Sequence, residues 1–169
     1  MRIIYLCFFF LLSTPSLAQV EIVFSSPMDF GSLEFAGGSA KGWVSLNKDG
    51  YVLIRQGANL RTQSRRARPG RLSAELSNVN KIAVVCEVEQ LHHQLVQVNK
   101  IRVFIEQLGK QFMCEQPTEV NVAGQSRLDL LITADLYIQG QRDGLLHQDW
   151  GVKVRLLPCN EATGVCSLN

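Results

Sequence analysis

The sequence predicts an all-β protein whose residues 19–169 form one antiparallel β-sandwich. Short runs of alternating apolar and polar residues recur along the chain, which is typical of strands with one buried face. Turn-forming residues separate these runs, and no clear internal repeat is present. After a leader is removed, roughly 150 residues remain, a length that favours a single domain with its own hydrophobic core.

Residues 1–18 have the pattern of a signal peptide. Arg2 is followed by an apolar run from Ile3 to Leu12, Pro15 ends that run, and a cleavage site with small residues ends at Ala18. The apolar run is too short to cross a bilayer of about 30 Å hydrocarbon thickness. We therefore expect export to the periplasm, the cell surface or the medium, with cleavage before Gln19 and no membrane span.

The first strand is expected at 20–24. On an extended chain Val20, Ile22 and Phe24 fall on one face, so this segment could also act as a donor strand that completes the sheet of a neighbouring subunit. The simpler interpretation, which we favour, is that it is the first strand of its own sandwich.

A β-hairpin is expected at 43–54. Trp43 to Leu46 and Tyr51 to Ile54 are β-prone runs, and the Asp49-Gly50 pair between them is a strong turn signal. The same turn matches the middle of a calcium-binding loop. That pattern fails at both ends, so a plain hairpin is favoured and no metal is expected here.

The second half of the chain contains further strand patterns. We expect strands at 72–76, 81–88, 100–106, 126–133, 134–138 and 150–156, with a polar loop at 140–149. Residues 89–98 carry apolar positions at helical spacing together with β-branched side chains, and both interpretations stay open for them.

Four cysteines follow the leader: Cys86, Cys114, Cys159 and Cys166. An even number in an exported chain indicates two disulfides, and of the three pairings we favour Cys86–Cys114 and Cys159–Cys166. Zinc is the competing interpretation, but neither pair has the close spacing of zinc ligands. We expect no metal and no cofactor.

An arginine-rich segment is expected to form an exposed loop. It contains Arg61, Arg65, Arg66, Arg68 and Arg71, and Pro69-Gly70 adds a turn signal. These side chains could bind an anionic polysaccharide or lipopolysaccharide phosphates. No aromatic residues are interleaved for base stacking, so nucleic acid is not an expected partner. A solvated connection between strands is the favoured interpretation.

No catalytic motif is recognisable in the sequence. His92 and His93 are adjacent and would point to opposite faces of an extended chain, and His147 lies alone in a polar loop. We therefore expect a protein that is not an enzyme, and an exported hydrolase ranks last among the interpretations.

The aromatic residues offer a second possible binding surface. Trp43, Trp150, Tyr51 and Tyr137 could form a platform for sugars, although aromatic side chains in sandwiches mostly pack in the core. We favour the core for Trp43 and Trp150.

Short glycine-based motifs mark the opening of the mature chain: the segment from Pro27 to Leu33, the pair Gly37-Gly38, the strand at Val44 and the turn at Asp49 to Tyr51. In these motifs the chain resembles a bacterial secreted family, domain of unknown function number 4402. The regions 122–138 and 150–156 are similar to the family's last two strands. This resemblance implies an immunoglobulin-like or pilin-like β-sandwich, similar also to spore-coat proteins, with a surface or fimbria-associated role and no catalytic residues.

These observations together predict a non-enzymatic structural or adhesive protein. Its expected partners are subunits of a pilus-like assembly or a periplasmic chaperone. The alternative is a soluble periplasmic module that binds an anionic ligand through its arginines. The mature chain has 16 basic and 15 acidic residues once Arg2 is lost from the 17 and 15 of the whole chain, so net charge favours no class of partner.

Overall fold

The computed structural model describes residues 18–35, 40–56, 59–62, 67–88, 96–140, 144–146, 152–160 and 163–167. The predicted signal peptide lies outside these residues, apart from Ala18. All regular structure in the described part is β, and every strand pair is antiparallel, so the predicted fold class is confirmed.

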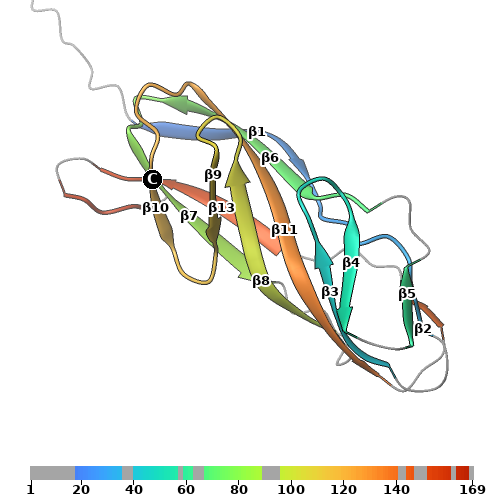
Figure 1. The fold of residues 1–169 in the computed structure, drawn as a ribbon. Helices are drawn as coiled ribbons and strands as arrows, with labels where there is room; N and C mark the ends of the chain where they lie inside the picture. Colours follow the sequence, from blue (N-terminus) through green and yellow to red (C-terminus); the bar gives the residue numbers. More distant parts are fainter. Residues whose placement is uncertain are drawn as a thin grey trace, which may run out of the picture.

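The larger sheet has seven strands (Figure 1). Five of them follow the order β1-β6-β11-β3-β4, and the other two branch from β11, with β8 paired to β11 and β9 paired to β8. Its members are β1 (Gln19–Ser26), β3 (Ala40–Leu46), β4 (Val52–Gln56), β6 (Gly70–Ser77), β8 (Val96–Ile105), β9 (Lys110–Met113) and β11 (Arg127–Gly140).

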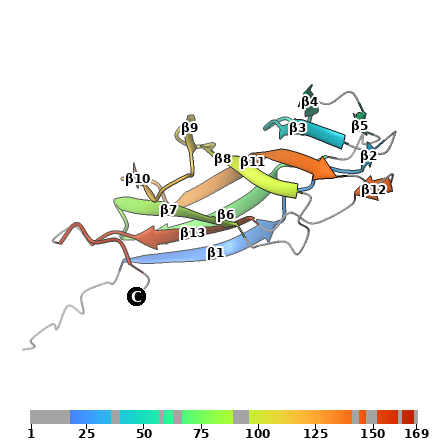
Figure 2. The ribbon, with the colours of Figure 1, turned by 90° about the horizontal axis from the view of Figure 1, so that it is seen from below.

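Two three-stranded sheets complete the part of the chain that the structure describes. One has the order β10-β7-β13 and consists of β7 (Lys81–Val88), β10 (Thr118–Asn121) and β13 (Val152–Pro158). The other has the order β12-β2-β5 and consists of β2 (Leu33–Phe35), β5 (Leu60–Thr62) and β12 (Gly144–Leu146). Figure 2 shows β7 and β13 between β1 and the strands β8 and β11 of the larger sheet, and the small β2–β5–β12 sheet at the end of the molecule away from β10.

Strand β11 organises the larger sheet. Leu130 pairs with β6 on one edge and with β8 on the other, and Asp135 pairs with β3 and β8 in the same way. Strands β6 and β3 therefore share one edge of β11, end to end, while β8 pairs with residues 130–138 along the other edge. The sheet forks between Ile132 of β11, the last residue that pairs with β6, and Asp135, the first that pairs with β3.

The hydrophobic core lies between the larger sheet and the β7 sheet. Alternate residues of β6 and β11, such as Ala74 and Leu128, are fully buried, and they share one cluster with Ile82 and Val84 of β7. Since successive side chains of a strand point to opposite faces, the intervening residues of β11, including Thr133 and Asp135, lie on the outer face of the sheet.

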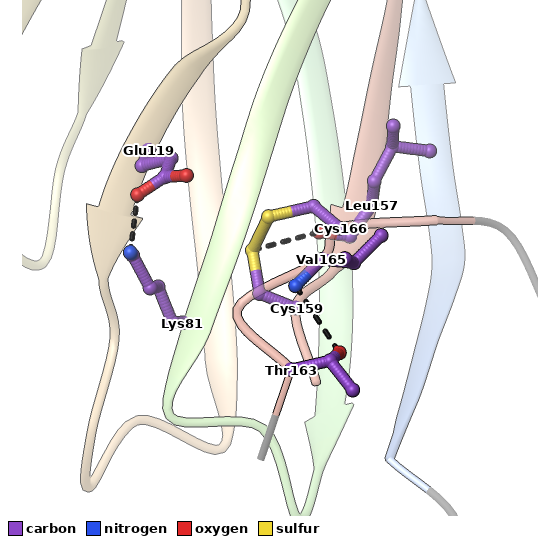
Figure 3. The surroundings of a disulfide bond; sticks show 7 residues. All are labelled: Lys81, Glu119, Leu157, Cys159, Thr163, Val165 and Cys166. Atoms are coloured by element: carbon purple, nitrogen blue, oxygen red, sulfur yellow. Dashed lines mark hydrogen bonds and ion pairs between the residues drawn. A yellow bond between two sulfur atoms is a disulfide. The ribbon is translucent and has the colours of Figure 1, made fainter. Parts of the chain in front are cut away.

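Both predicted disulfides are confirmed. Cys86 of β7 is bonded to Cys114, which follows β9, so this disulfide joins the two sheets of the sandwich. Cys159 is bonded to Cys166 and closes a turn after β13 (Figure 3). Within that turn the Val165 N–H donates to Thr163 Oγ1 at 3.3 Å. All four cysteines are consumed in disulfides and are not available as zinc ligands.

The hairpin and the main strands match the sequence predictions, but several boundaries differ. The hairpin forms between β3 and β4, and Asn47 Oδ1 accepts the Tyr51 N–H at 2.8 Å across its turn. The expected strands at 126–133 and 134–138 are one continuous strand, β11. The expected strand at 100–106 begins earlier, at Val96, and it carries a bulge near Lys100, whose φ is 46°. This resolves 96–98 as strand, whereas 89–95 lie outside the described residues.

The short strands β2, β5, β9, β10 and β12 were not predicted, because three or four residues are too few to show a period of two. The expected loop at 140–149 contains β12 and the last residue of β11, so that prediction was wrong in part. No helix long and apolar enough to cross a membrane occurs in the described part of the chain.

Candidate functional site

Strand β1 forms one edge of the larger sheet, and six of its eight residues are exposed. Its register with β6 runs from Gln19 opposite Ser77 to Ser26 opposite Arg71. Among the described residues, no strand pairs with the other edge of β1. The first segment is therefore a strand of its own sandwich, as favoured from the sequence.

Three consecutive apolar side chains of β1 are half-exposed: Ile22 at 49%, Val23 at 45% and Phe24 at 50%. Sheet edges in native proteins are usually protected by charged side chains, proline or a covering segment. Ile22, Val23 and Phe24 carry no charge, so we call them the apolar edge. An exposed run of this kind indicates a surface for another polypeptide.

A register shift at Val23 corrects one expectation about this strand. Ile22 lies opposite Ala74, whereas Phe24 lies opposite Ser73, the neighbouring residue of β6. Directly paired residues of antiparallel strands share a face. Ile22 therefore shares the face of the buried Ala74, and Phe24 lies on the outer face. The sequence expectation that Val20, Ile22 and Phe24 share one face is wrong, because the extra residue Val23 reverses the alternation.

A hollow of about 860 Å³ adjoins the apolar edge on the outer face. Phe24 of β1 contributes to its wall, together with Arg68 from the connection into β6, Arg71 of β6 and Lys48 from the tip of the β3–β4 hairpin. We call it the basic hollow. Asp29 and Asp49 also line it, and Asp29 Oδ1 already accepts the Gly31 N–H at 2.6 Å.

The walls of the hollow are held by backbone contacts. The amides and carbonyls of Asp29 and Arg68 exchange two hydrogen bonds, at 2.8 and 2.7 Å. The hairpin tip packs on the same segment, since a Cβ at Gly50 would lie 3.0 Å from the Ala67 carbonyl oxygen. Gly50 also has a φ of 82°, a conformation that favours glycine.

The structure separates the five arginines predicted as an anion site. Arg68 and Arg71 line the basic hollow, but Arg61 belongs to β5, which pairs with β2, and it does not line the hollow. The expectation of one exposed loop is therefore wrong at both ends, because Arg61 and Arg71 lie in strands. Arg65 and Arg66 lie outside the described residues.

Lys48 and Phe24 are members of this surface that the sequence analysis did not assign to it. No local pattern could have identified them, because about twenty residues or more separate each of them from Arg68. The strand pairing of β1 with β6 and the folding of the hairpin tip onto 67–69 bring them together.

The other sequence candidates contribute little to this site. His92, His93, His147 and Trp150 lie outside the described residues. Trp43 and Tyr137 pair across β3 and β11, with ring centroids 4.9 Å apart, and both are partly exposed, so the predicted core position of Trp43 is not what the structure shows. Tyr51 is 68% exposed.

One carboxylate on the outer face has a shifted pKa. Asp129 Oδ1 accepts a hydrogen bond from Ser73 Oγ at 2.5 Å and is paired with Arg127 at 3.1 Å, and these contacts hold the pKa of Asp129 below its usual value of 3.8. A carboxylate stabilised as the anion is a poor proton donor or acceptor near neutral pH. This cluster therefore supports the sheet and offers no acid–base chemistry.

In comparisons with family models, curated proteins and solved structures, the chain matches none of them. The resemblance to domain of unknown function number 4402 therefore stays a prediction.

Proposed function

We propose that this protein is a non-enzymatic subunit of an exported surface or fimbria-like assembly, and that it binds its partner through the apolar edge and the basic hollow. The observation that carries the proposal is the exposure of Ile22, Val23 and Phe24 on an edge strand. A partner strand added beside β1 would receive main-chain hydrogen bonds and bury these side chains.

The neighbouring charges specify the partner further. Arg68, Arg71 and Lys48 lie beside Phe24, against the carboxylates of Asp29 and Asp49. This small excess of positive charge favours a partner strand that is apolar along β1 and acidic where it passes the hollow. The role agrees with the structural or adhesive protein that the sequence resemblance implies.

Association of the mature protein tests the proposal. The parent chain is expected to form oligomers, or a complex with a co-expressed partner, in size-exclusion chromatography with light scattering. Val23→Lys and Phe24→Lys place a charge on the edge and are expected to abolish association while leaving the thermal midpoint within a few degrees, since both positions are half-exposed.

Val165→Lys is the matched control, because Val165 is also an exposed apolar residue, at 59%, and lies in the turn after β13. It is expected to associate as the parent does. A parent that stays monomeric in concentrated solution and in co-expression with its genomic neighbours, or a control that loses association as fully as Phe24→Lys does, would refute the proposal.

A second function is favoured by a specific observation, the gathering of Arg68, Arg71 and Lys48 around one hollow. In this alternative, the protein is a periplasmic module that binds an anionic polysaccharide or the phosphates of lipopolysaccharide. Guanidinium groups bind phosphate and carboxylate oxygens through paired hydrogen bonds, which suits such ligands.

Retention on heparin at low salt tests the alternative. Arg68→Ser combined with Arg71→Ser is expected to elute at lower salt than the parent, whereas Arg61→Ser, an exposed arginine outside the hollow, should elute with the parent. Equal elution of all three proteins would exclude the hollow as an anion site.

A further inference from the structure

A second, smaller pocket lies on the outer face of the larger sheet. It has a volume of about 280 Å³ and is enclosed by the β3–β4 hairpin on one side and by β8, β9 and β11 on the other. Lys48 and Asp49 line it as well as the basic hollow, so the hairpin tip separates the two spaces.

The floor of this pocket is polar and buried. Ser45 of β3 and Thr133 of β11 are 3% and 6% exposed, and Arg102 of β8 lies beside them. Ser45 is directly opposite Asp135 in the β3–β11 register, and Arg102 is directly opposite Thr133. Arg102 Nη2 donates a hydrogen bond to Asp135 Oδ2 at 2.7 Å, which neutralises the guanidinium.

Two buried oxygen atoms have no hydrogen-bond partner among the described residues: Oγ of Ser45, which lines the pocket, and Oδ1 of Asp135, the residue opposite Ser45, which does not. Buried polar atoms are nearly always paired, because burying a hydroxyl or a carboxylate oxygen without a partner is unfavourable. Because Ser45 lines the pocket, its hydroxyl is the one of these two groups that adjoins the pocket.

The mouth of the pocket is cationic. Lys48 and Arg55 are exposed there, against the single carboxylate of Asp49. Lys48 Nζ lies 5.0 Å from the centroid of the Phe104 ring, a cation–π contact that holds the ammonium group at the wall. The pocket therefore combines a buried hydroxyl at its floor with an excess of positive charge at its mouth.

We propose that this pocket binds a sugar acid of monosaccharide size. A hydroxyl of the ligand would bond to Ser45 Oγ at the floor, and its carboxylate would lie between Arg55 and Lys48 at the mouth. A volume of about 280 Å³ is at the lower limit of ligand pockets, which are roughly 300–1,000 Å³, so it suits one ring and excludes longer chains.

Calorimetric titration of the mature protein with glucuronate tests the proposal. Glucose retains the hydroxyls without the carboxylate, and acetate retains the carboxylate without the ring hydroxyls. Each is expected to bind at least about tenfold more weakly than glucuronate, since each lacks one of the two contacts. Arg55→Gln is expected to reduce the affinity for glucuronate toward that for glucose.

Ser45→Ala and Ser73→Ala provide a matched pair of variants. Both serines are buried, but Ser73 Oγ donates to Asp129 and lies outside the pocket. Ser45→Ala is expected to weaken glucuronate binding roughly tenfold without lowering the thermal midpoint, because its hydroxyl makes no bond within the described fold. Ser73→Ala is expected to lower the thermal midpoint and leave the affinity unchanged.

Three results would overturn the proposal. Absence of glucuronate binding at millimolar concentration would exclude the site, and acetate binding as tightly as glucuronate would reduce it to a general carboxylate site. Equal loss of affinity in Ser45→Ala and Ser73→Ala would show that the pocket floor is not in contact with the ligand. None of these results bears on association through β1, since Val23 and Phe24 do not line this pocket.

Discussion

Ser45 and Asp135 face each other across β3 and β11, ninety residues apart in the chain, and each buries one oxygen atom without a hydrogen-bond partner among the described residues. Arg102 approaches Asp135 from β8 on the opposite side of β11. The fork of the larger sheet therefore has a polar centre, surrounded by the buried apolar residues of β11. The contribution of these buried polar groups to the free energy of unfolding can be measured.

Removal of one partner of the Arg102–Asp135 ion pair is expected to destabilise the protein strongly. Asp135 and Arg102 have side chains that are 5% and 17% exposed, so Arg102→Met leaves a buried carboxylate without its cation. Such a change costs about 3–5 kcal/mol. Urea denaturation of Arg102→Met, Asp135→Leu and the double variant measures the coupling. The double variant should be more stable than Arg102→Met alone, and equal stability of the two would contradict this account.

The Ser73–Asp129 hydrogen bond is expected to make stability depend on acid pH. The pKa of Asp129 in the folded protein is lowered below 3.8, mainly by the bond from Ser73 and then by Arg127. A lowered folded pKa contributes stability above the unfolded pKa, and this contribution disappears as the pH falls through the folded pKa.

Ser73→Ala should therefore raise the pKa of Asp129 toward 3.8, as measured by NMR titration of its carboxyl carbon. The stability difference between Ser73→Ala and the parent should be larger at about pH 6 than at about pH 2. A difference that is independent of pH would show that the hydroxyl acts only through packing.

The two disulfides are expected to contribute unequally to stability. Their sequence separations are 28 and 7 residues, and loop-closure entropy assigns about 3.5 kcal/mol to Cys86–Cys114 and about 2.5 kcal/mol to Cys159–Cys166. Replacing Cys86 and Cys114 with Ala should lower the thermal midpoint by about 10 °C, and replacing Cys159 and Cys166 by about 7 °C. Scanning calorimetry of both double variants measures the two losses. A larger loss of the thermal midpoint on removal of Cys159–Cys166 than on removal of Cys86–Cys114 would contradict the prediction.

Gly50 is expected to tolerate a side chain less well than Gly109. Both have a positive φ, of 82° and 59°, but a Cβ at Gly50 would lie 3.0 Å from the Ala67 carbonyl oxygen, while a Cβ at Gly109 meets nothing within 4 Å. Gly109→Ala should cost about 1 kcal/mol for the backbone conformation alone, and Gly50→Ala about 2–3 kcal/mol. Chemical denaturation gives both values, and equal costs would mean that the hairpin tip is free to move away from 67–69.

Local patterns in the sequence were sufficient to predict the strands in which apolar and polar residues alternate over a long enough run. The hairpin between β3 and β4 follows from β-prone residues around Asp49-Gly50, and β13 follows from the period of two that ends at Leu156. The number of disulfides followed from an even number of cysteines, and the structure confirms the pairing that was favoured among the three possible ones. These features depend on neighbours in the chain, whose side chains decide the backbone conformation directly.

The candidate sites depend on register and could come only from the tertiary structure. One extra residue at Val23 turns Phe24 to the outer face, and the alternation of the sequence does not reveal that bulge. The contacts of Lys48 with the basic hollow and of Ser45 with Asp135 join residues from separate strands. The sequence by itself determined that the chain forms antiparallel strands linked by two disulfides. The pairing of β11 with β6, β3 and β8 decided which side chains meet, because register is set by the packing of the whole sheet.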